Sequence, residues 1–268
     1  MIFAAWREIL AFYEAIKDAF QNISGNDMLM TAAIIAWIVL TTIFFGLLTI
    51  FVSFISRKGD LPHKVAGIWA RSIMAASPIE VTVKGLSNID PDKSYIYMSN
   101  HQSNYDIPIL LGHLPVQFRW LAKIELFRIP VFGYAMKRAG YICIDRSNQK
   151  SAFESLKKAA GIIRDGVSVM VFPEGTRSMD GNIGSFKKGG FVLAVESGVP
   201  IVPVIIYGTF SIMPKSRLLI KPGKVTLEVL EPVETSGFTK ETKDGLMEKI
   251  RNIMCESIDE EKKGNSSC

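Results

Sequence analysis

The sequence predicts an α/β fold in which helices flank a mixed, largely buried β-sheet, preceded by an N-terminal membrane-anchoring segment of two helices. Short apolar segments of strand length alternate with helical segments along most of the 268 residues, which is typical of α/β proteins. An uncharged stretch near the N-terminus accompanies a mean hydropathy of +0.22, which is high for a soluble protein. The 48% apolar composition excludes an intrinsically disordered chain.

Residues 1–60 form the predicted membrane-anchoring part, and residues 61–268 form the α/β domain. Residues 2–20 are expected to form an interfacial amphipathic helix, or alternatively a helix packed on the domain. Residues 28–56 carry no charge and would form a helix of about 43 Å, longer than the roughly 30 Å hydrocarbon core. We therefore expect a membrane helix, and neither a buried soluble helix nor a cleaved signal peptide. Basic residues follow this stretch, so if it spans, the domain should face the cytoplasm.

The rest of the chain contains seven predicted strands and three predicted helices. The strand segments are short and apolar or alternating, at Ile79–Leu86, Ser94–Ser99, Phe118–Ala122, Gly140–Asp145, Val167–Phe172, Val199–Tyr207 and Lys224–Glu231. The first helix, from Ser151 to Asp165, begins at a Ser-x-x-Glu capping box and stops before Gly166. The other two are expected over Lys188–Ser197 and from Phe238 to about Glu260.

Cysteine spacing and charge limit the classes of function. Cys143, Cys255 and Cys268 show no CxxC or Cys/His spacing, which disfavours a disulfide framework and a zinc site and fits a reducing compartment. No metal or cofactor is expected. Residues 61–230 hold 21 Lys and Arg against 12 Asp and Glu. This basic region suits anionic partners such as phosphates, anionic lipid or nucleic acid, although charge alone does not separate them.

Three polar clusters follow directly on predicted strands. They begin at Asn100, at Arg146 and at Pro173. In open α/β sheets, ligands bind beyond the carboxyl ends of strands. If the three strands are parallel neighbours, one His, one Asp, two Arg and one Glu converge in one crevice.

His101 and Asp106 form the candidate catalytic pair. They are five positions apart, so a continuous helix would point them about 140° apart, whereas a junction between a loop and a helix can bring them together. A histidine so placed accepts a proton near neutral pH, and a carboxylate fixes its tautomer. In the alternative interpretation, Asp106 has only a structural role as the N-cap of a helix, with Pro108 in the first helical turn.

These clusters resemble the sequence boxes of the PlsC-type glycerolipid acyltransferase family. Asn-His-Gln-Ser-Asn-Tyr-Asp from Asn100 is similar to the family's N-H-x-S-x-x-D box, and Phe-Pro-Glu-Gly-Thr-Arg-Ser from Phe172 matches its third box residue for residue. The strand ending in Arg146 resembles the second box, and the segment Val199–Val204 resembles the fourth. The motif HxxxxD alone is a weak signal, but four boxes in order are specific. They cover Asn100 to Val204 and leave the N-terminal part and the last sixty residues outside.

The resemblance implies roles for the substrate-binding residues. Arg146 and Arg177 suit the phosphate of the acceptor, because guanidinium forks match phosphate oxygens. Glu174 is expected to orient an arginine or a glycerol hydroxyl, and Gly175 to let a backbone N–H approach the anion. Thr176 belongs to the same box. Lys123, like Lys187 and Lys188, is either a contact to the donor's phosphates, the oxyanion or the bilayer, or a solvated surface lysine; Pro203 reads as structural, suited to an edge or a bulge.

The function implied is acyl transfer from acyl-CoA or acyl carrier protein to the sn-2 hydroxyl of 1-acylglycerol-3-phosphate, the activity most like that of this family's lysophosphatidic acid acyltransferases. His101 would be the general base and Asp106 would orient it. Another acceptor, such as glycerol-3-phosphate, dihydroxyacetone phosphate or another lysophospholipid, is the nearest alternative. A non-catalytic membrane-anchored lipid-binding protein is the second. A serine esterase is disfavoured because no G-x-S-x-G motif occurs, and nucleic-acid binding because no basic helix or stacking-aromatic motif occurs.

Overall fold

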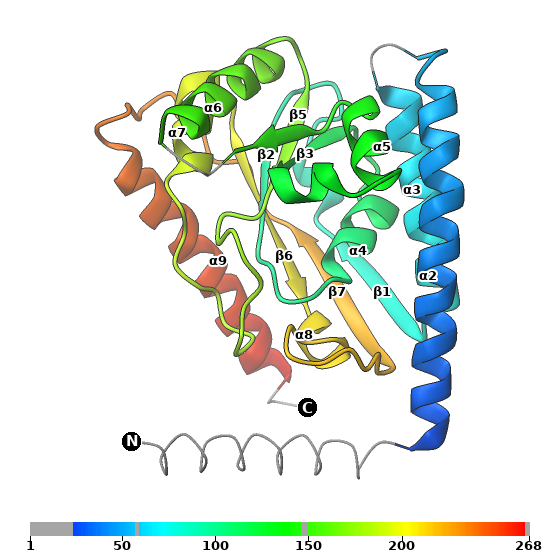
Figure 1. Ribbon diagram of the computed structural model, residues 1–268. Helices are drawn as coiled ribbons and strands as arrows, with labels where there is room; N and C mark the ends of the chain where they lie inside the picture. Colours follow the sequence, from blue (N-terminus) through cyan, green and yellow to red (C-terminus); the bar gives the residue numbers. More distant parts are fainter. Residues whose placement is uncertain (1–23, 57–58, 146–148, 266–268) are drawn as a thin grey trace, which may run out of the picture.

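A computed structural model describes residues 24–56, 59–145 and 149–265. The predicted interfacial helix over residues 2–20 lies outside the described residues, as do Arg146 and Cys268. Figure 1 shows a twisted sheet with helices on both faces and one long helix standing along its side.

The sheet contains all seven predicted strands, and it is mixed. Its strand order is β1-β7-β6-β2-β5-β3-β4, and every neighbouring pair is parallel except β6 and β7. The two central strands β2 and β5 are buried along their whole length, as the parallel arrangement requires. The strands span Ile79–Lys84, Ile96–Ser99, Phe118–Lys123, Ile142–Ile144, Ser168–Val171, Ile201–Tyr207 and Gly223–Val229 for β1 to β7.

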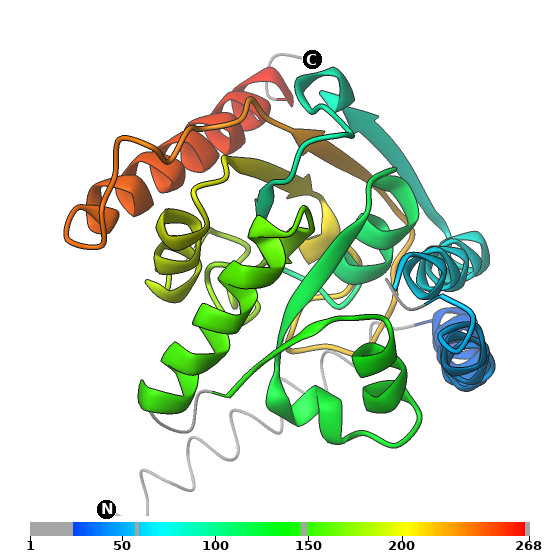
Figure 2. The same cartoon turned by 90° about the horizontal axis from the view of Figure 1, so that it is seen from above.

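Helices cover the two faces of the sheet (Figure 2). Two separate apolar cores lie beneath them. One core lies under α3 (Asp60–Ala76) and α4 (Asp106–His113), and the other under α6 (Gln149–Arg164), α7 (Gly189–Ser197) and α9 (Lys243–Asn265). Side chains of β2 alternate between them, with Tyr97 in the first core and Ile96 and Met98 in the second. The short elements are η1 (Leu86–Asn88), η2 (Ile124–Arg128), α5 (Phe132–Arg138) and α8 (Thr209–Ile212).

Two predicted helix starts are wrong. Helix α6 begins at Gln149, so Ser151 lies inside its first turn, where its carbonyl accepts a bond from the Ser155 hydroxyl at 2.8 Å. The Ser-x-x-Glu pattern is therefore not a capping box here. Helix α9 begins at Lys243 and not at Phe238, because Thr239 and Thr242 first form a side-chain-bonded turn, with the Thr242 hydroxyl 2.8 Å from the Thr239 N–H.

Pro203 lies in β6, which is an inner strand of the sheet. Just past the end of β7, the pairing with β6 contains an extra residue. Val204 pairs with Val229 and Ile201 pairs with Val233, so three residue steps on β6 lie opposite four steps on the other segment. Such an extra residue is a bulge, where a missing ladder donor is tolerated. The proline carbonyl still accepts a bond from the Leu230 N–H at 3.0 Å.

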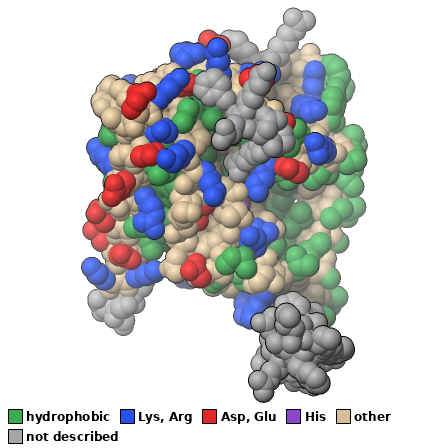
Figure 3. Space-filling model, turned by 60° about the vertical axis from the view of Figure 1, so that its left-hand side comes forward, with side chains coloured by type: hydrophobic (Ala, Val, Ile, Leu, Met, Phe, Trp, Pro, Cys, Tyr) green, Lys and Arg blue, Asp and Glu red, His purple; other side chains and the backbone are tan. Residues whose placement is uncertain are grey.

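Helix α2 (Gly25–Val52) is the long helix at the side of the molecule, packed against α3 and α5. Among the described residues it is the one helix long and apolar enough to cross a membrane. Five residues of α2 are buried against the protein. Four of them are small or polar, namely Thr31, Thr41, Gly46 and Thr49, and the fifth is Ile34. Its large apolar side chains point outward, among them Leu29, Val39, Leu40, Ile43, Phe44, Leu47, Phe51 and, just beyond its end, Phe54 and Ile55. Figure 3 shows hydrophobic side chains along the right-hand edge of the molecule, which is the side of α2.

Hydrogen bonds tie α2 to the domain near both of its ends. The Thr31 hydroxyl accepts a bond from the Ile220 N–H at 3.1 Å, and the Ser53 hydroxyl accepts one from the Arg138 guanidinium at 2.7 Å. Between them, the Trp69 indole N–H donates to the Thr42 hydroxyl at 3.1 Å. The helix therefore lies along the flank of the α/β domain for most of its length.

The turn before α5 holds a strained residue against α2. Val131 has φ 60° and ψ −60°, and the Phe132 N–H bonds to the Pro130 carbonyl across it at 2.6 Å. This is a γ-turn of the unfavourable hand, which a β-branched residue rarely adopts. A Cβ built on Gly46 of α2 would lie 2.9 Å from a Val131 methyl group, so glycine is what permits this close approach.

Candidate active site

The strands that lead to the polar clusters end at the same edge of the sheet because they run parallel. Strands β2 and β5 are neighbours, as expected, but β3 lies between β5 and β4. The three predicted strands are therefore not all adjacent, since β3 enters the sheet among them and brings Lys123 to this edge. Arg146, which follows β4, lies outside the described residues.

His101 and Asp106 meet at the junction between β2 and α4. Asp106 is fully buried, and its Oδ2 accepts bonds from His101 Nδ1 at 2.7 Å and from the N–H groups of Gln102 at 2.7 Å and Ser103 at 2.8 Å. Asp106 is the first residue of α4 and not its N-cap, which is Tyr105. Its carboxylate thus holds the preceding loop. Pro108 fits in the first turn, where N–H groups have no partner within the helix.

The ring of His101 is oriented from two sides. An ionised Asp106 can only accept, so His101 Nδ1 carries a proton and the neutral ring keeps Nε2 as a proton acceptor. The Phe172 ring stacks on the imidazole with centroids 3.9 Å apart and planes 8° apart. His101 lines the main cavity, so this arrangement can remove a proton from a hydroxyl bound there.

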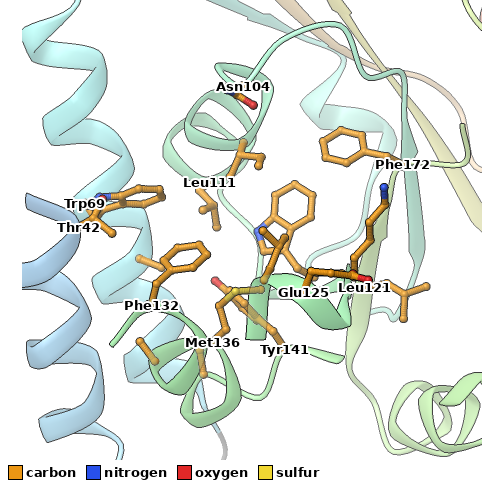
Figure 4. A pocket seen from close by; sticks show the side chains of 18 of the residues that line it. Thr42, Trp69, Asn104, Leu111, Leu121, Glu125, Phe132, Met136, Tyr141 and Phe172 are labelled. Carbon is orange, nitrogen blue, oxygen red and sulfur yellow. The ribbon is translucent and has the colours of Figure 1, made fainter. Parts of the chain in front are cut away.

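The main cavity has a volume of about 650 Å³ and two unlike ends. Its polar end, here called the mouth, is formed by His101, Asn104, Gly175, Thr176, Arg177 and Lys215. Its apolar end is formed by side chains from α2, α3, α5, β3 and the residue before β4, among them Phe45, Trp69, Trp120, Phe132, Met136 and Tyr141. Figure 4 shows Trp69 entering this space from α3, and Phe132 and Met136 entering it from α5.

Residues of the third predicted box divide between the mouth and the interior. Gly175 has φ 71°, a conformation that favours glycine, and it turns the chain so that Thr176 and Arg177 reach the mouth. No side chain in the described part of the protein pairs with the Arg177 guanidinium, so it is available to an anion. Glu174 does not line the cavity; it is 4% exposed and bonds to backbone N–H groups.

Lys215 is a cation at the mouth that the motifs did not identify. Its ammonium donates to the Thr176 hydroxyl at 3.1 Å. The segment before it is fixed by Ser103, whose hydroxyl donates to the Met213 carbonyl at 2.8 Å and which pairs with Pro214 in a β-bridge. A single lysine after a proline carries no sequence signal, because its place depends on this contact between distant segments.

The lysines proposed from the sequence take different positions. Lys123 lines the cavity beside Glu125. Lys188 forms a surface ion pair with Asp244 at 2.7 Å. Lys187 lies at a smaller cavity of about 280 Å³ on the other side of Phe172. Over the described ranges, no group of His, Cys, Asp and Glu side chains could hold a metal ion.

The chain is similar to known acyltransferases in sequence and in fold. Residues 80–207 match the family model described as Acyltransferase. A chloroplastic 1-acyl-sn-glycerol-3-phosphate acyltransferase of Arabidopsis thaliana is 37% identical over 199 residues, which are 74% of this chain and 54% of that protein. The enzyme of the same name from Limnanthes alba is 34% identical over 206 residues, 75% of this chain and 70% of that protein.

A solved structure is similar over nearly its whole length. The crystal structure of the 1-acyl-sn-glycerophosphate acyltransferase PlsC from Thermotoga maritima superimposes with a TM-score of 0.75 at 32% identity, covering 88% of this chain and 96% of that one. The first curated relatives are longer, since this chain spans 54% to 60% of their length.

Proposed function

The chain belongs to the acyltransferase family that these relatives share, and from that premise we propose that it transfers a fatty acyl group from a thioester to the sn-2 hydroxyl of 1-acylglycerol-3-phosphate, making phosphatidic acid. One observation carries the proposal. A histidine bonded to a buried carboxylate lies in a cavity with a cationic mouth and an apolar far end. A lysophosphatidic acid acceptor and a fatty acyl donor together present a phosphate, a hydroxyl and hydrocarbon chains, which match those features.

The reaction needs one base and no enzyme nucleophile. His101 Nε2 takes the proton of the acceptor hydroxyl as its oxygen attacks the thioester carbonyl carbon. The new C–O bond forms, the C–S bond breaks, and the proton passes from the imidazolium to the leaving thiolate. Asp106 holds the ring and balances its positive charge. Ser103 supports direct transfer, because its buried hydroxyl is already bonded to the Met213 carbonyl.

The mouth suits the phosphate of the acceptor. Arg177 and Lys215 carry positive charges at one place, and Thr176 holds Lys215 toward the cavity. Guanidinium and ammonium groups form charge-assisted hydrogen bonds with phosphate oxygens. Lys123 is a further cation that lines the cavity, while the contribution of Arg146 stays a prediction from the motif.

The apolar end suits a fatty acyl chain. Its walls are hydrocarbon and aromatic side chains supplied by α2, α3 and α5. Each methylene transferred from water to such a surface contributes about 0.8 kcal/mol. We assign this end to the acyl group of the donor, with the thioester at His101; acyl-CoA and acyl carrier protein both fit this assignment. No cofactor is needed for the transfer.

Helix α2 is proposed to lie in one leaflet of the membrane. Its outward face is apolar, which is typical of a lipid-exposed surface. Its inward face is bonded to the domain near both ends, so a helix crossing the bilayer would carry the flank of the sheet domain into hydrocarbon. Half-immersion keeps the cavity beside the lipid substrates. The basic domain favours the cytoplasmic side, whose leaflet is anionic.

The activity is tested with purified protein, acyl-CoA or acyl carrier protein as donor, and a panel of acceptors read by mass spectrometry. We expect phosphatidic acid from 1-acylglycerol-3-phosphate. Product from glycerol-3-phosphate or another lysophospholipid in its place would move the proposal to that acceptor. Acceptor binding without any product would leave a lipid-binding protein.

The membrane arrangement is tested with single cysteines at the two ends of α2. In a background with the native cysteines replaced by serine, Asn26→Cys and Ser56→Cys place thiols at polar positions in the first turn of α2 and just beyond its end. In sealed vesicles, a one-leaflet helix makes both thiols reactive to a membrane-impermeant reagent from the same side. Labelling from opposite sides would establish a spanning helix.

A further inference from the structure

The carboxylate of Glu174 is fully engaged with the backbone. Its Oε1 accepts a bond from the His101 N–H at 2.9 Å, and its Oε2 accepts one from the Gly184 N–H at 2.8 Å. The side chain is buried and is not among the residues that line the cavity, although the next three residues are. Neither oxygen is therefore turned toward a bound acceptor.

The segment around Glu174 contacts His101 at two further points, and Asp106 of α4 adds a third contact. The Ser178 N–H donates to the His101 carbonyl at 2.7 Å, so both polar groups of the His101 main chain are bonded to this one segment. Phe172 stacks on the imidazole. Asp106 binds the ring and the next two N–H groups of the loop. Two buried carboxylates thus bind three successive backbone amides.

We infer that Glu174 is a positioning residue that fixes the main chain of His101, so that the imidazole reaches Asp106 and the cavity together, and that it does not bind the acceptor. The inference rests on the proposed function, because only that function makes the His101 imidazole a general base whose position matters. It differs from the expectation that Glu174 orients an arginine or a glycerol hydroxyl: Gly175, Thr176 and Arg177 line the cavity, whereas Glu174 does not.

The two N–H donors at position 174 require a carboxylate there. It accepts at both oxygens, whereas a glutamine accepts at one and presents an NH₂ group to the second N–H donor. Burial raises the pKa of Glu174, and the bonds from the Gly184 and His101 N–H groups oppose that rise. A Cβ at Gly184 would lie 3.0 Å from Oε2, so Gly184→Ala disturbs the same carboxylate from outside the cavity.

The test compares Glu174→Gln with a matched variant elsewhere. Misplacing a catalytic group by about 1 Å costs about 10²-fold in rate, so we expect Glu174→Gln to lower kcat by about 10- to 100-fold and to leave the KM values of acceptor and donor within about twofold. Gly184→Ala should change kcat in the same direction. Glu228→Gln neutralises a carboxylate elsewhere that is half-buried and bonded to Tyr207 and Ser257, and it should leave kcat unchanged.

A spectroscopic readout separates positioning from loss of fold. In NMR spectra of the detergent-solubilised protein, the His101 amide proton should lie downfield, and it should move upfield in Glu174→Gln while the melting temperature changes little. A raised acceptor KM with intact kcat would overturn the inference in favour of substrate binding, and unchanged kinetics with an unchanged amide shift would also overturn it. If Glu174→Gln fails to fold, Gly184→Ala gives the same two readouts. Absence of acyl transfer in the unmodified protein would defeat the proposed function but leaves the amide test standing.

Discussion

The two ends of the main cavity are built in different ways. The mouth is formed by loops at the ends of β2 and β5 and by the segment after α8, and it carries the imidazole and the cations. The far end is formed mainly by helices, two of which lie before the first strand, and it is apolar. In the proposed reaction, this division separates proton transfer and phosphate recognition from the binding of the hydrocarbon chain. Each end can therefore be altered without the other, and the following experiments use that independence.

Removing the base should have the largest effect. A general base contributes about 10² to 10⁴ in rate, so His101→Ala should lower kcat/KM by that factor, and Asp106→Asn should lower it substantially. The preference among donor chain lengths should not change, because the far end is untouched. His113→Asn, at the C-terminal end of α4 and outside the cavity, is the control. Full activity in His101→Ala would remove the assignment of the base.

A charge beneath the far end should destabilise the protein at low pH. His63 in α3 packs edge-on against Phe118, and its Nδ1 lies 3.4 Å from the hydroxyl of the cavity residue Tyr141. Burial and the nearby Arg119 guanidinium lower the pKa of His63 from 6.5 to about 4.

The direction of this pH effect on stability follows from the state that binds the His63 proton at higher pH, which is the unfolded chain. As pH falls from 6.5 toward 4, the unfolded state takes up a proton at His63 that the folded state refuses, so the free energy of unfolding should decrease by about 3 kcal/mol. Denaturant unfolding at several pH values measures this, and His63→Gln should flatten the dependence. An equally steep decrease in His63→Gln would show that other groups cause it.

Neutralising the cations of the mouth should weaken binding of the phosphate. Hydrogen bonds to charged groups contribute about 1.5 to 3 kcal/mol, so Arg177→Gln and Lys215→Gln should each raise the acceptor KM by about 10- to 100-fold. Donor chain preference should persist. Arg217→Gln removes a neighbouring surface charge outside the cavity and controls for general electrostatics. A similar penalty with a monoacylglycerol acceptor, which lacks the phosphate, would argue against this contact.

Filling the far end should change the preference among acyl-chain lengths. The expected change in kcat/KM for each methylene is the smallest of these effects. Ala135 of α5 lines the cavity and is 7% exposed, so Ala135→Leu shortens the space there. Each methylene that no longer fits loses about 0.8 kcal/mol, roughly fourfold in kcat/KM. A series of acyl-CoA donors should show long chains disfavoured and short chains unaffected. A uniform loss across all lengths would indicate damage to the site instead.

The mouth could be predicted from sequence to the extent that its residues follow strands. His101 and Asp106 stand on one strand exit, and Gly175 to Arg177 stand on another, so a parallel sheet alone brings them to one edge. Lys215 could not be predicted, because its position depends on the bond between Ser103 and the Met213 carbonyl, two residues 110 positions apart. Glu174 belongs to the same motif as Arg177, yet its direction depends on the backbone turn at Gly175.

The far end was beyond prediction for a different reason. The apolar length of α2 indicates a membrane helix but not which side of it meets the domain. Its protein-facing residues are mostly threonines and a glycine, which carry no hydropathy signal. The capping-box pattern at Ser151 failed because helix α6 extends two residues further back than the local sequence suggests.

Val131 gives the contact between α2 and α5 an energetic cost. A non-glycine residue held in such a conformation costs about 1 to 3 kcal/mol, and it persists only while its surroundings enforce it. Excising α2 to obtain a water-soluble fragment would leave His101 and Asp106 in place, but it would remove one wall and release this residue. We expect the truncated protein to lose its preference for acyl-chain length before it loses acyl transfer itself. A water-soluble form made in this way would therefore not keep the chain-length preference.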